Sequence, residues 1–89
     1  MKRGDTMKIV YFAWLREKVG LAEEEVTPPE NVRDIDALLE WLKGRSDGHG
    51  AALADLRMVR VAINQSYAAG NHPVGPKDEV ALFPPVTGG

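Results

Sequence analysis

Four stretches of the chain have the length and the apolar pattern of β-strands. Residues 7–12 ("MKIVYF") and 79–83 ("EVALF") are rich in β-branched, aromatic and other apolar side chains. Residues 58–65 ("MVRVAINQ") alternate, with three aliphatic side chains on one face, as in a half-buried strand. Residues 23–27 ("EEEVT") are polar and end at two prolines, which cannot donate backbone hydrogen bonds. The pattern therefore predicts three well-buried strands and a fourth near a sheet edge.

Helical spacing occurs in two further stretches. Residues 13–20 ("AWLREKVG") contain helix formers and end in a glycine, which predicts one or two helical turns. The main helix is expected within residues 31–46, capped by Asn31 or Asp34 and ended at Gly44. Its apolar stripe consists of Ile35, Leu38, Leu39 and Leu42.

The order of these elements predicts an α+β fold. A glycine-bearing loop with a helical turn at residues 51–56 follows the main helix, and a short strand is expected near Tyr67. The first and last long strands are the most hydrophobic, so we expect them side by side at the sheet centre, parallel because a helical crossover separates them. A mixed sheet wrapped on one main helix in this order is a β-grasp (ubiquitin-like) arrangement.

The domain organisation expected from the sequence is simple. A chain of 89 residues has room for one core and little internal cavity. Residues 1–6 form a polar N-terminal extension, residues 7–85 the β-grasp domain, and residues 86–89 an extended, reactive C-terminal tail. Any chemistry is expected at the periphery of the domain.

Composition and charge exclude several classes of function. Eleven basic residues are scattered among thirteen acidic ones, for a net charge of −2, and form no stripe for nucleic acid. Without cysteine there is neither a disulfide framework nor a cysteine nucleophile. His49 and His72 lack ligand spacing and are expected on surface loops, so we predict no metal site. The run Glu23–Glu25 is interpreted as a solvated strand edge.

The start of the chain contains no export signal by its pattern. Asp5 interrupts the charged and apolar opening, and no small-residue cleavage site follows it. The sequence contains no run of about twenty apolar residues, which is the length that a helix needs to span a bilayer. We therefore expect the protein in the cytoplasm.

The final residues, "FPPVTGG", suggest chemistry at the chain end. Pro84 and Pro85 favour an extended course away from the sheet, and two glycines without Cβ atoms suit a narrow channel. Four extended residues reach about 13 Å at about 3.3 Å per residue, enough to enter another protein's active site. The terminal carboxylate would then react after conversion to an acyl-adenylate. Because neither G-x-G-x-x-G nor a Walker pattern occurs, ATP must bind elsewhere and this protein is a substrate.

Several motifs together resemble the ThiS/MoaD group of ubiquitin-like sulfur carriers, and most closely its molybdopterin synthase small subunits. They are "VYFAWLREKVG", "VAINQ", "HPV" and "DEVALFPPVTGG", and the resemblance covers residues 7–89. It implies that the Gly89 carboxylate is adenylated with ATP in trans and becomes a thiocarboxylate. That group gives its sulfur to cyclic pyranopterin monophosphate, and two transfers form the molybdopterin dithiolene. No cofactor is bound by the carrier itself.

The same resemblance implies partners and site residues. The partners are an E1-like adenylyltransferase (MoeB), the synthase large subunit (MoaE), with which the family forms a heterotetramer, and indirectly a cysteine desulfurase or rhodanese-type sulfur donor. Gly89 is the covalent carrier and Gly88 allows the tail to enter the active site, so the subunit carries sulfur without catalysing the transfer. The residues expected to contact partners are Phe12, Arg16, Tyr67, Phe83, Pro84, Pro85, Val86 and Thr87.

Two alternatives stay open at this point. The same thiocarboxylate could serve thiazole, cysteine or tRNA thiolation, although the "FPPVTGG" ending and the length favour the molybdopterin branch. A ubiquitin-like binding module with an inert tail belongs to a different class and predicts that a residue added after Gly89 is tolerated. Conjugation to other proteins is also compatible with a reactive glycine terminus.

Overall fold

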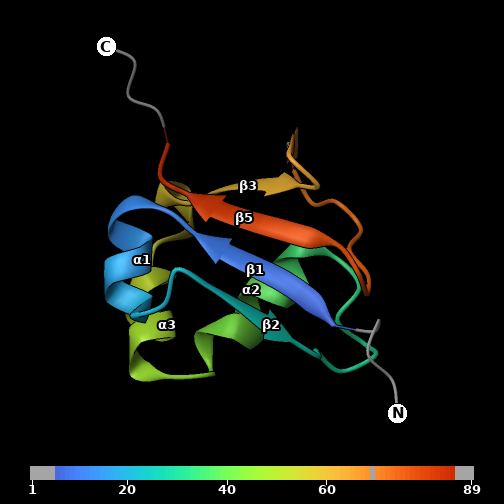
Figure 1. Ribbon diagram of the computed structural model, residues 1–89, viewed down its shortest axis with the longest axis horizontal. Helices are drawn as coiled ribbons and strands as arrows, with labels where there is room; N and C mark the ends of the chain where they lie inside the picture. The colour runs from blue at the N-terminus through green and yellow to red at the C-terminus, as the bar shows by residue number, and fades with distance from the viewer. Residues whose placement is uncertain (1–5, 69, 86–89) are drawn as a thin grey trace.

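The computed structural model describes residues 6–68 and 70–85 of the chain. Five strands, three α-helices and one 3-10 helix follow one another along the chain (Figure 1). Their bounds are β1 (Met7–Tyr11), α1 (Ala13–Val19), β2 (Glu23–Val26), α2 (Ile35–Lys43), α3 (Asp47–Ala52), η1 (Leu56–Met58), β3 (Arg60–Ile63), β4 (Ser66–Ala68) and β5 (Glu79–Phe83).

The strands form one mixed sheet in the order β2-β1-β5-β3-β4. β1 and β5 are parallel neighbours at its centre, with Ile9 beside Val80 and Tyr11 beside Leu82. β2 pairs antiparallel with β1 at one edge of the sheet. On the other side, β3 pairs antiparallel with β5 and also with the edge strand β4. The predicted β-grasp fold is thereby confirmed, including the central parallel pair and the polar edge strand.

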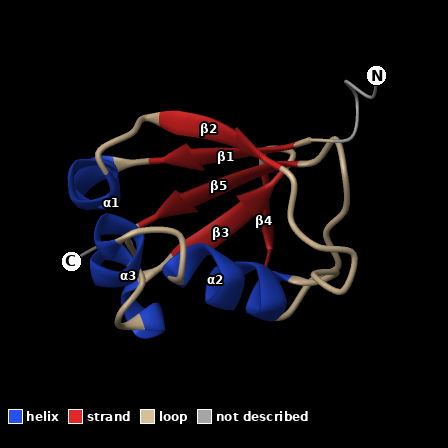
Figure 2. Ribbon diagram, turned by 90° about the horizontal axis from the view of Figure 1, so that it is seen from below, coloured by secondary structure: helices blue, strands red, loops and turns tan. Residues whose placement is uncertain are grey.

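The helices cover one face of the sheet, as Figure 2 shows with the sheet seen nearly edge-on. Alternate strand residues point into the core between the two layers, and the intervening residues point to the uncovered face. The most completely buried large side chains come from both layers: Tyr11, Met7, Ile9, Leu15, Leu38, Leu42, Leu53, Leu82 and Val80. Burial of this apolar surface is the main term that stabilises the fold.

The main helix begins and ends where its sequence predicts. The Asp34 carboxylate accepts a hydrogen bond of 2.9 Å from the Ala37 backbone N–H, so Asp34 is the N-cap, and Gly44 is the C-cap. Four apolar residues of its stripe are buried. α1 likewise ends at Gly20, whose φ of 89° lies in the left-handed region that glycine adopts without strain.

The segment after α2 differs from its prediction. A helical turn was expected at residues 51–56, but α3 starts earlier, at Asp47, and the chain then forms η1 around Leu56. The reason is local capping, because the Ser46 hydroxyl accepts a hydrogen bond from the His49 backbone N–H at 3.1 Å and the Asp55 carboxylate accepts one from Arg57. The two glycines of α3 concealed its helical spacing in the sequence.

Two turns place non-glycine residues at positive φ. Asn64 and Gln65 have φ values of 51° and 71° in the two-residue turn between β3 and β4, as a type I′ hairpin requires. Lys77, with φ of 74°, occupies the third position of the turn closed by a 3.2 Å bond from the Asp78 N–H to the Gly75 carbonyl. Left-handed backbone at these positions stores local strain.

The described residues contain neither a membrane-spanning helix nor a metal-binding group of side chains. Among these residues no helix has both the length and the apolar character needed to cross a membrane. In the same part of the chain, no three His, Cys, Asp or Glu side chains are grouped so that they could hold a metal ion.

Candidate functional site: the outer face and the root of the tail

The uncovered face of the sheet, here called the outer face, presents a continuous row of side chains. Its members alternate with the core residues of the same strands, and the strand register places them next to one another. Ala81 lies beside Val10 on one side and beside Ala62 on the other, and Tyr67 pairs with Ala62. The outer face consists of Lys8, Val10, Arg60, Ala62, Tyr67, Glu79, Ala81 and Phe83.

Two shallow hollows lie on this face, one along β5 and one at the end of this strand. One, of about 510 Å³, is lined by Phe12, Ala62, Gln65, Glu79, Ala81 and Phe83. The other, of about 310 Å³, is lined by Arg60, Tyr67, Phe83 and Pro85. Phe83 belongs to both hollows and immediately precedes the two prolines, so the tail leaves the domain from this apolar surface. We call Phe83, Pro84 and Pro85 the tail root.

Phe12 reaches the outer face because the chain turns sharply behind it. Its backbone N–H still donates to the Leu82 carbonyl at 3.0 Å, so it is held beside β5. Ala13 has φ of 56° and starts α1 at once, which prevents β1 from continuing. Phe12 is 46% exposed and Tyr67 63% exposed, although both are large aromatic side chains. Exposed aromatic side chains clustered on one face are typical of interaction surfaces.

The sequence-predicted site residues are only partly brought together. Phe12, Tyr67, Phe83 and Pro85 line the two hollows, and Pro84 connects two of them. Arg16 is exposed on α1, four residues beyond Phe12, and lines neither hollow. The predicted tail residues Val86, Thr87, Gly88 and Gly89 lie outside the described residues. Their roles stay predictions.

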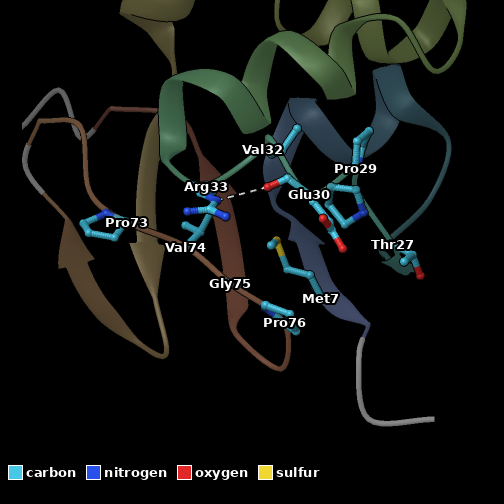
Figure 3. A pocket seen from close by; sticks show the side chains of 11 residues that line it. Met7, Thr27, Pro29, Glu30, Val32, Arg33, Pro73, Val74, Gly75 and Pro76 are labelled. Atoms are coloured by element: carbon cyan, nitrogen blue, oxygen red, sulfur yellow. Dashed lines mark hydrogen bonds between the residues drawn. The ribbon is translucent and has the colours of Figure 1, made fainter. Parts of the chain in front are cut away.

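A third hollow, of about 690 Å³, lies at the opposite end of the central strands (Figure 3). Met7, at the start of β1, lines it together with the proline-containing loops that carry Pro29 and Pro76. The Arg33 Nε donates to the Glu30 carbonyl at 3.2 Å across its wall. No sequence-predicted site residue lies here, so this hollow belongs to a different part of the molecule from the tail root.

A group of five polar side chains lies under the sheet and joins β1 and β2 to α3 and the residues just before it. The Tyr11 hydroxyl donates to Glu24 Oε2 at 2.7 Å, and His49 Nε2 is also 2.7 Å from that oxygen. His49 Nδ1 lies 2.7 Å from the Ser46 hydroxyl. Arg45 Nη2 lies 3.5 Å from Glu24 Oε1. His49 is 5% exposed, so this polar cluster is part of the packed interior.

The cluster alters the titration of two of its members. Burial alone would raise the pKa of the Glu24 carboxyl, but hydrogen bonds from Tyr11 and His49 and the nearby positive charges outweigh it, so the pKa lies below its ordinary value. Burial, together with the hydrogen bond to Glu24 and its charge, raises the pKa of Tyr11 above its ordinary value. At neutral pH Glu24 is therefore an acceptor and Tyr11 a donor.

Two sequence-based expectations about this cluster are wrong. His49 was expected on a surface loop, yet it is buried in α3, and Glu24 is not a solvated edge residue, because its side chain is only 13% exposed. The sequence contained usable signals. His49, Ala52 and Leu53 share helical spacing, and Glu24 shares the inward face of its strand with Val26 by alternation.

The sheet order and the single helical layer define the ubiquitin-like β-grasp class of proteins. The ThiS family model matches residues 9–89, and the chain belongs to this family. It is 39% identical over 83 residues to the molybdopterin synthase sulfur carrier subunit of Escherichia coli (93% of this chain, 99% of the relative). It is 32% identical, with the same coverage of both chains, to the molybdopterin synthase sulfur carrier subunit of Haemophilus influenzae.

Solved structures agree with this assignment. The fold superimposes on the crystal structure of SAMP1 from Haloferax volcanii with a TM-score of 0.71 and 29% sequence identity, covering 94% of this chain and 99% of that one.

Proposed function

We propose that this protein is the sulfur carrier subunit of a molybdopterin synthase, acting in the cytoplasm. The observation that carries the proposal is the exposed aromatic surface at Phe83 and Pro85, the point from which the sequence runs on to Gly88 and Gly89. Membership of the ThiS family and the two relatives named as molybdopterin synthase sulfur carrier subunits support it.

The proposed chemistry takes place at the Gly89 carboxylate. An E1-like adenylyltransferase of the MoeB type joins this carboxylate to the AMP part of ATP and releases pyrophosphate. Sulfur from a cysteine desulfurase or rhodanese-type donor, supplied in effect as hydrosulfide, attacks the acyl carbon and displaces AMP. The product is a terminal thiocarboxylate, and ATP is used in trans, with no cofactor held by this chain.

The second stage uses a large subunit of the MoaE type. The thiocarboxylate sulfur forms a bond to a side-chain carbon of cyclic pyranopterin monophosphate and displaces the oxygen substituent of that carbon. Water then cleaves the acyl–sulfur bond, which leaves the sulfur on the pterin and restores the carboxylate. Two such transfers supply the two dithiolene sulfurs, in a heterotetramer of two small and two large subunits. Residues 86–89 span at most about 13 Å, so the tail root must dock close to the partner's active site.

Within this scheme, the domain contributes docking and orientation. Phe83 and Phe12 supply apolar area at the point where the tail leaves, and Tyr67 adds an aromatic surface on β4. Pro84 and Pro85 restrict the backbone and reduce the entropy lost when the tail is threaded. Gly88 and Gly89 allow a narrow channel to close around the reacting carbon.

The test is the intact mass of the protein after incubation with ATP, a MoeB enzyme and sulfide. We expect the full-length chain to gain the mass difference between sulfur and oxygen, and a chain lacking Gly89 to gain none. The loaded protein, mixed with the large subunit and cyclic pyranopterin monophosphate, should yield molybdopterin. No adenylate and no sulfur, with an enzyme active on another carrier, would overturn the proposal in favour of an inert-tailed binding module.

A second set of outcomes separates the other carrier roles. The fold match includes a small archaeal modifier protein from Haloferax volcanii, so conjugation is the competing use of an activated glycine end. Sulfur loading without molybdopterin formation would assign the thiocarboxylate to thiazole, cysteine or tRNA thiolation. A covalent adduct of Gly89 with lysine side chains in the reaction mixture would indicate conjugation.

A further inference from the structure

Arg60 is a cation that lies beside the apolar side chains at the tail root. It is half-buried, pairs directly with Phe83 in the strand register, and lines the hollow at the tail root together with Tyr67 and Pro85. A partner that covers Phe83 and Tyr67 therefore also covers Arg60 and removes water from its guanidinium group.

This guanidinium is not neutralised within the described part of the chain. There, no carboxylate oxygen lies within 4.0 Å of it, and its one hydrogen bond goes from Nη1 to the Arg57 carbonyl at 3.3 Å. The nearest candidate on the same stretch, Asp55, is engaged with Arg57 at 3.0 Å.

The other cation of the outer face, Lys8, has a carboxylate partner, which sets Arg60 apart. Lys8 Nζ lies 3.6 Å from Glu23 Oε1, and Lys8 is also the direct register neighbour of Glu79. Lys8 lies at the start of β1, away from the tail root, whereas Glu79 lines the larger of the two outer-face hollows together with Phe12 and Phe83. Of the two cations of the outer face, Arg60 is therefore the one without a carboxylate partner among the described residues.

Burying an unpaired cation costs several kcal/mol, whereas arginine paired with a carboxylate is among the strongest anchors of protein interfaces. We propose that Arg60 binds a carboxylate of the large subunit, located within the apolar surface that receives Phe83 and Tyr67. This inference rests on the proposed function and specifies the partner's chemistry at the docking site. A planar guanidinium would hold that carboxylate in a fixed orientation and so align the tail root with the channel.

The first experiment measures the dissociation constant between this chain and the large subunit of the same species by titration calorimetry at two salt concentrations. We expect Arg60→Leu to weaken binding by about tenfold to a hundredfold, because the partner's carboxylate is left buried without its cation, and Arg60→Glu to weaken it further. The matched control Lys8→Leu removes a cation at the far end of the same face and should change binding less than about twofold. Unchanged melting temperatures would show that each variant is folded.

The second experiment identifies the acceptor directly. In the Arg60→Lys chain, a carbodiimide should join the new amine to an Asp or Glu of the large subunit, and mass spectrometry should locate the joined peptides. Equal or tighter binding by Arg60→Leu, or the absence of a cross-link at position 60, would overturn this inference. The proposed function would still hold if the wild-type chain accepts sulfur and binds the large subunit. A wild-type chain that neither binds the large subunit nor accepts sulfur would overturn both.

Discussion

The imidazole of His49 and the carboxylate of Glu24 lie 2.7 Å apart although 25 residues separate them in the sequence. This contact fastens α3 to the edge strand β2, and Tyr11 of the central strand β1 donates to the same carboxylate oxygen. Besides the backbone pairing with β1 and the burial of Val26, this contact ties the edge strand β2 to the helical layer. Removing one member would leave the others buried without partners, which costs about 1–3 kcal/mol per group.

The first prediction concerns Glu24→Gln and pH. Because the folded-state pKa of Glu24 is lowered, its ionisation stabilises the protein fully above the ordinary glutamate pKa of about 4.3, and this contribution is lost as pH falls through the lowered value. At pH 7 the variant should lose about 1–3 kcal/mol of unfolding free energy. The difference from wild type should shrink in acid, as measured by urea unfolding between about pH 3 and 7.

The control for that measurement is Glu17→Gln, which removes an exposed carboxylate on α1. Its unfolding free energy should stay within about 0.5 kcal/mol of the wild-type value at pH 7. A difference between Glu24→Gln and wild type that is constant across the whole pH range would show that the cluster does not depend on the charge of Glu24.

The second prediction concerns the close approach of α3 to α1 at Gly48. A Cβ atom there would collide with the backbone carbonyl oxygen of Lys18, which cannot move away without shifting α1. We expect Gly48→Ala to lower the unfolding free energy by about 1–3 kcal/mol, despite the higher helix propensity of alanine. In the control Gly44→Ala, the new methyl group would lie 3.8 Å from the Trp41 carbonyl oxygen, an ordinary van der Waals contact. Thermal unfolding should therefore give a lower Tm for Gly48→Ala than for Gly44→Ala. Equal stability of both variants would contradict the proposed collision.

The third prediction concerns strain in the turn before β5. Lys77 has φ of 74° at a position where glycine is preferred, so Lys77→Gly should raise the unfolding free energy by up to about 1 kcal/mol. For a domain of this size that corresponds to about 4–8 °C in Tm. Lys77→Ala keeps the strained backbone and should give no such gain. If the alanine variant were stabilised equally, the side chain of Lys77 would be the cause.

The fourth prediction separates the fold from the chemistry at the chain end. Gly89 has no side chain to bury, so its deletion should change the unfolding free energy by less than about 0.5 kcal/mol while abolishing sulfur loading. An alanine added after Gly89 should leave Tm unchanged as well and prevent molybdopterin formation, because the reactive carbon is displaced by one residue. Retained activity of the extended chain would indicate that the tail is not a covalent carrier.

The sequence was informative where burial alone decides the structure. The hydrophobicity of residues 7–12 and 79–83 predicted the central parallel pair, because the central strands of a sheet are the most deeply buried and need apolar residues on the core side. The end of β5 at Phe83 was also confirmed, and of the two predicted caps, Asn31 and Asp34, the structure has Asp34. These features depend on local propensity and on one-dimensional periodicity, which a single sequence displays.

Features that depend on pairing across the fold were harder to obtain. Nothing local shows that Glu24, Tyr11 and His49 converge, because each partner lies on a different element and polar residues are exposed by default. The same limit applies to Arg60, whose alternation placed it opposite the core but whose neighbour Phe83 follows only from the β3–β5 register. Arg16 is exposed on α1, and the partner contact that the family resemblance implies for it stays a prediction.

Because β5 is the last strand in the sequence and lies at the centre of the sheet, the domain can fold only after this strand has been synthesised. β5 lies between β1 and β3 and contributes Val80 and Leu82, both fully buried, so the core cannot close before these residues have been synthesised. A polypeptide abandoned on the ribosome before this strand would lack the docking surface as well as the tail, and would be exposed to proteolysis. Under the proposed function, an activating enzyme would therefore meet folded carriers only after translation has passed the last strand, so that incomplete chains would not be loaded with sulfur.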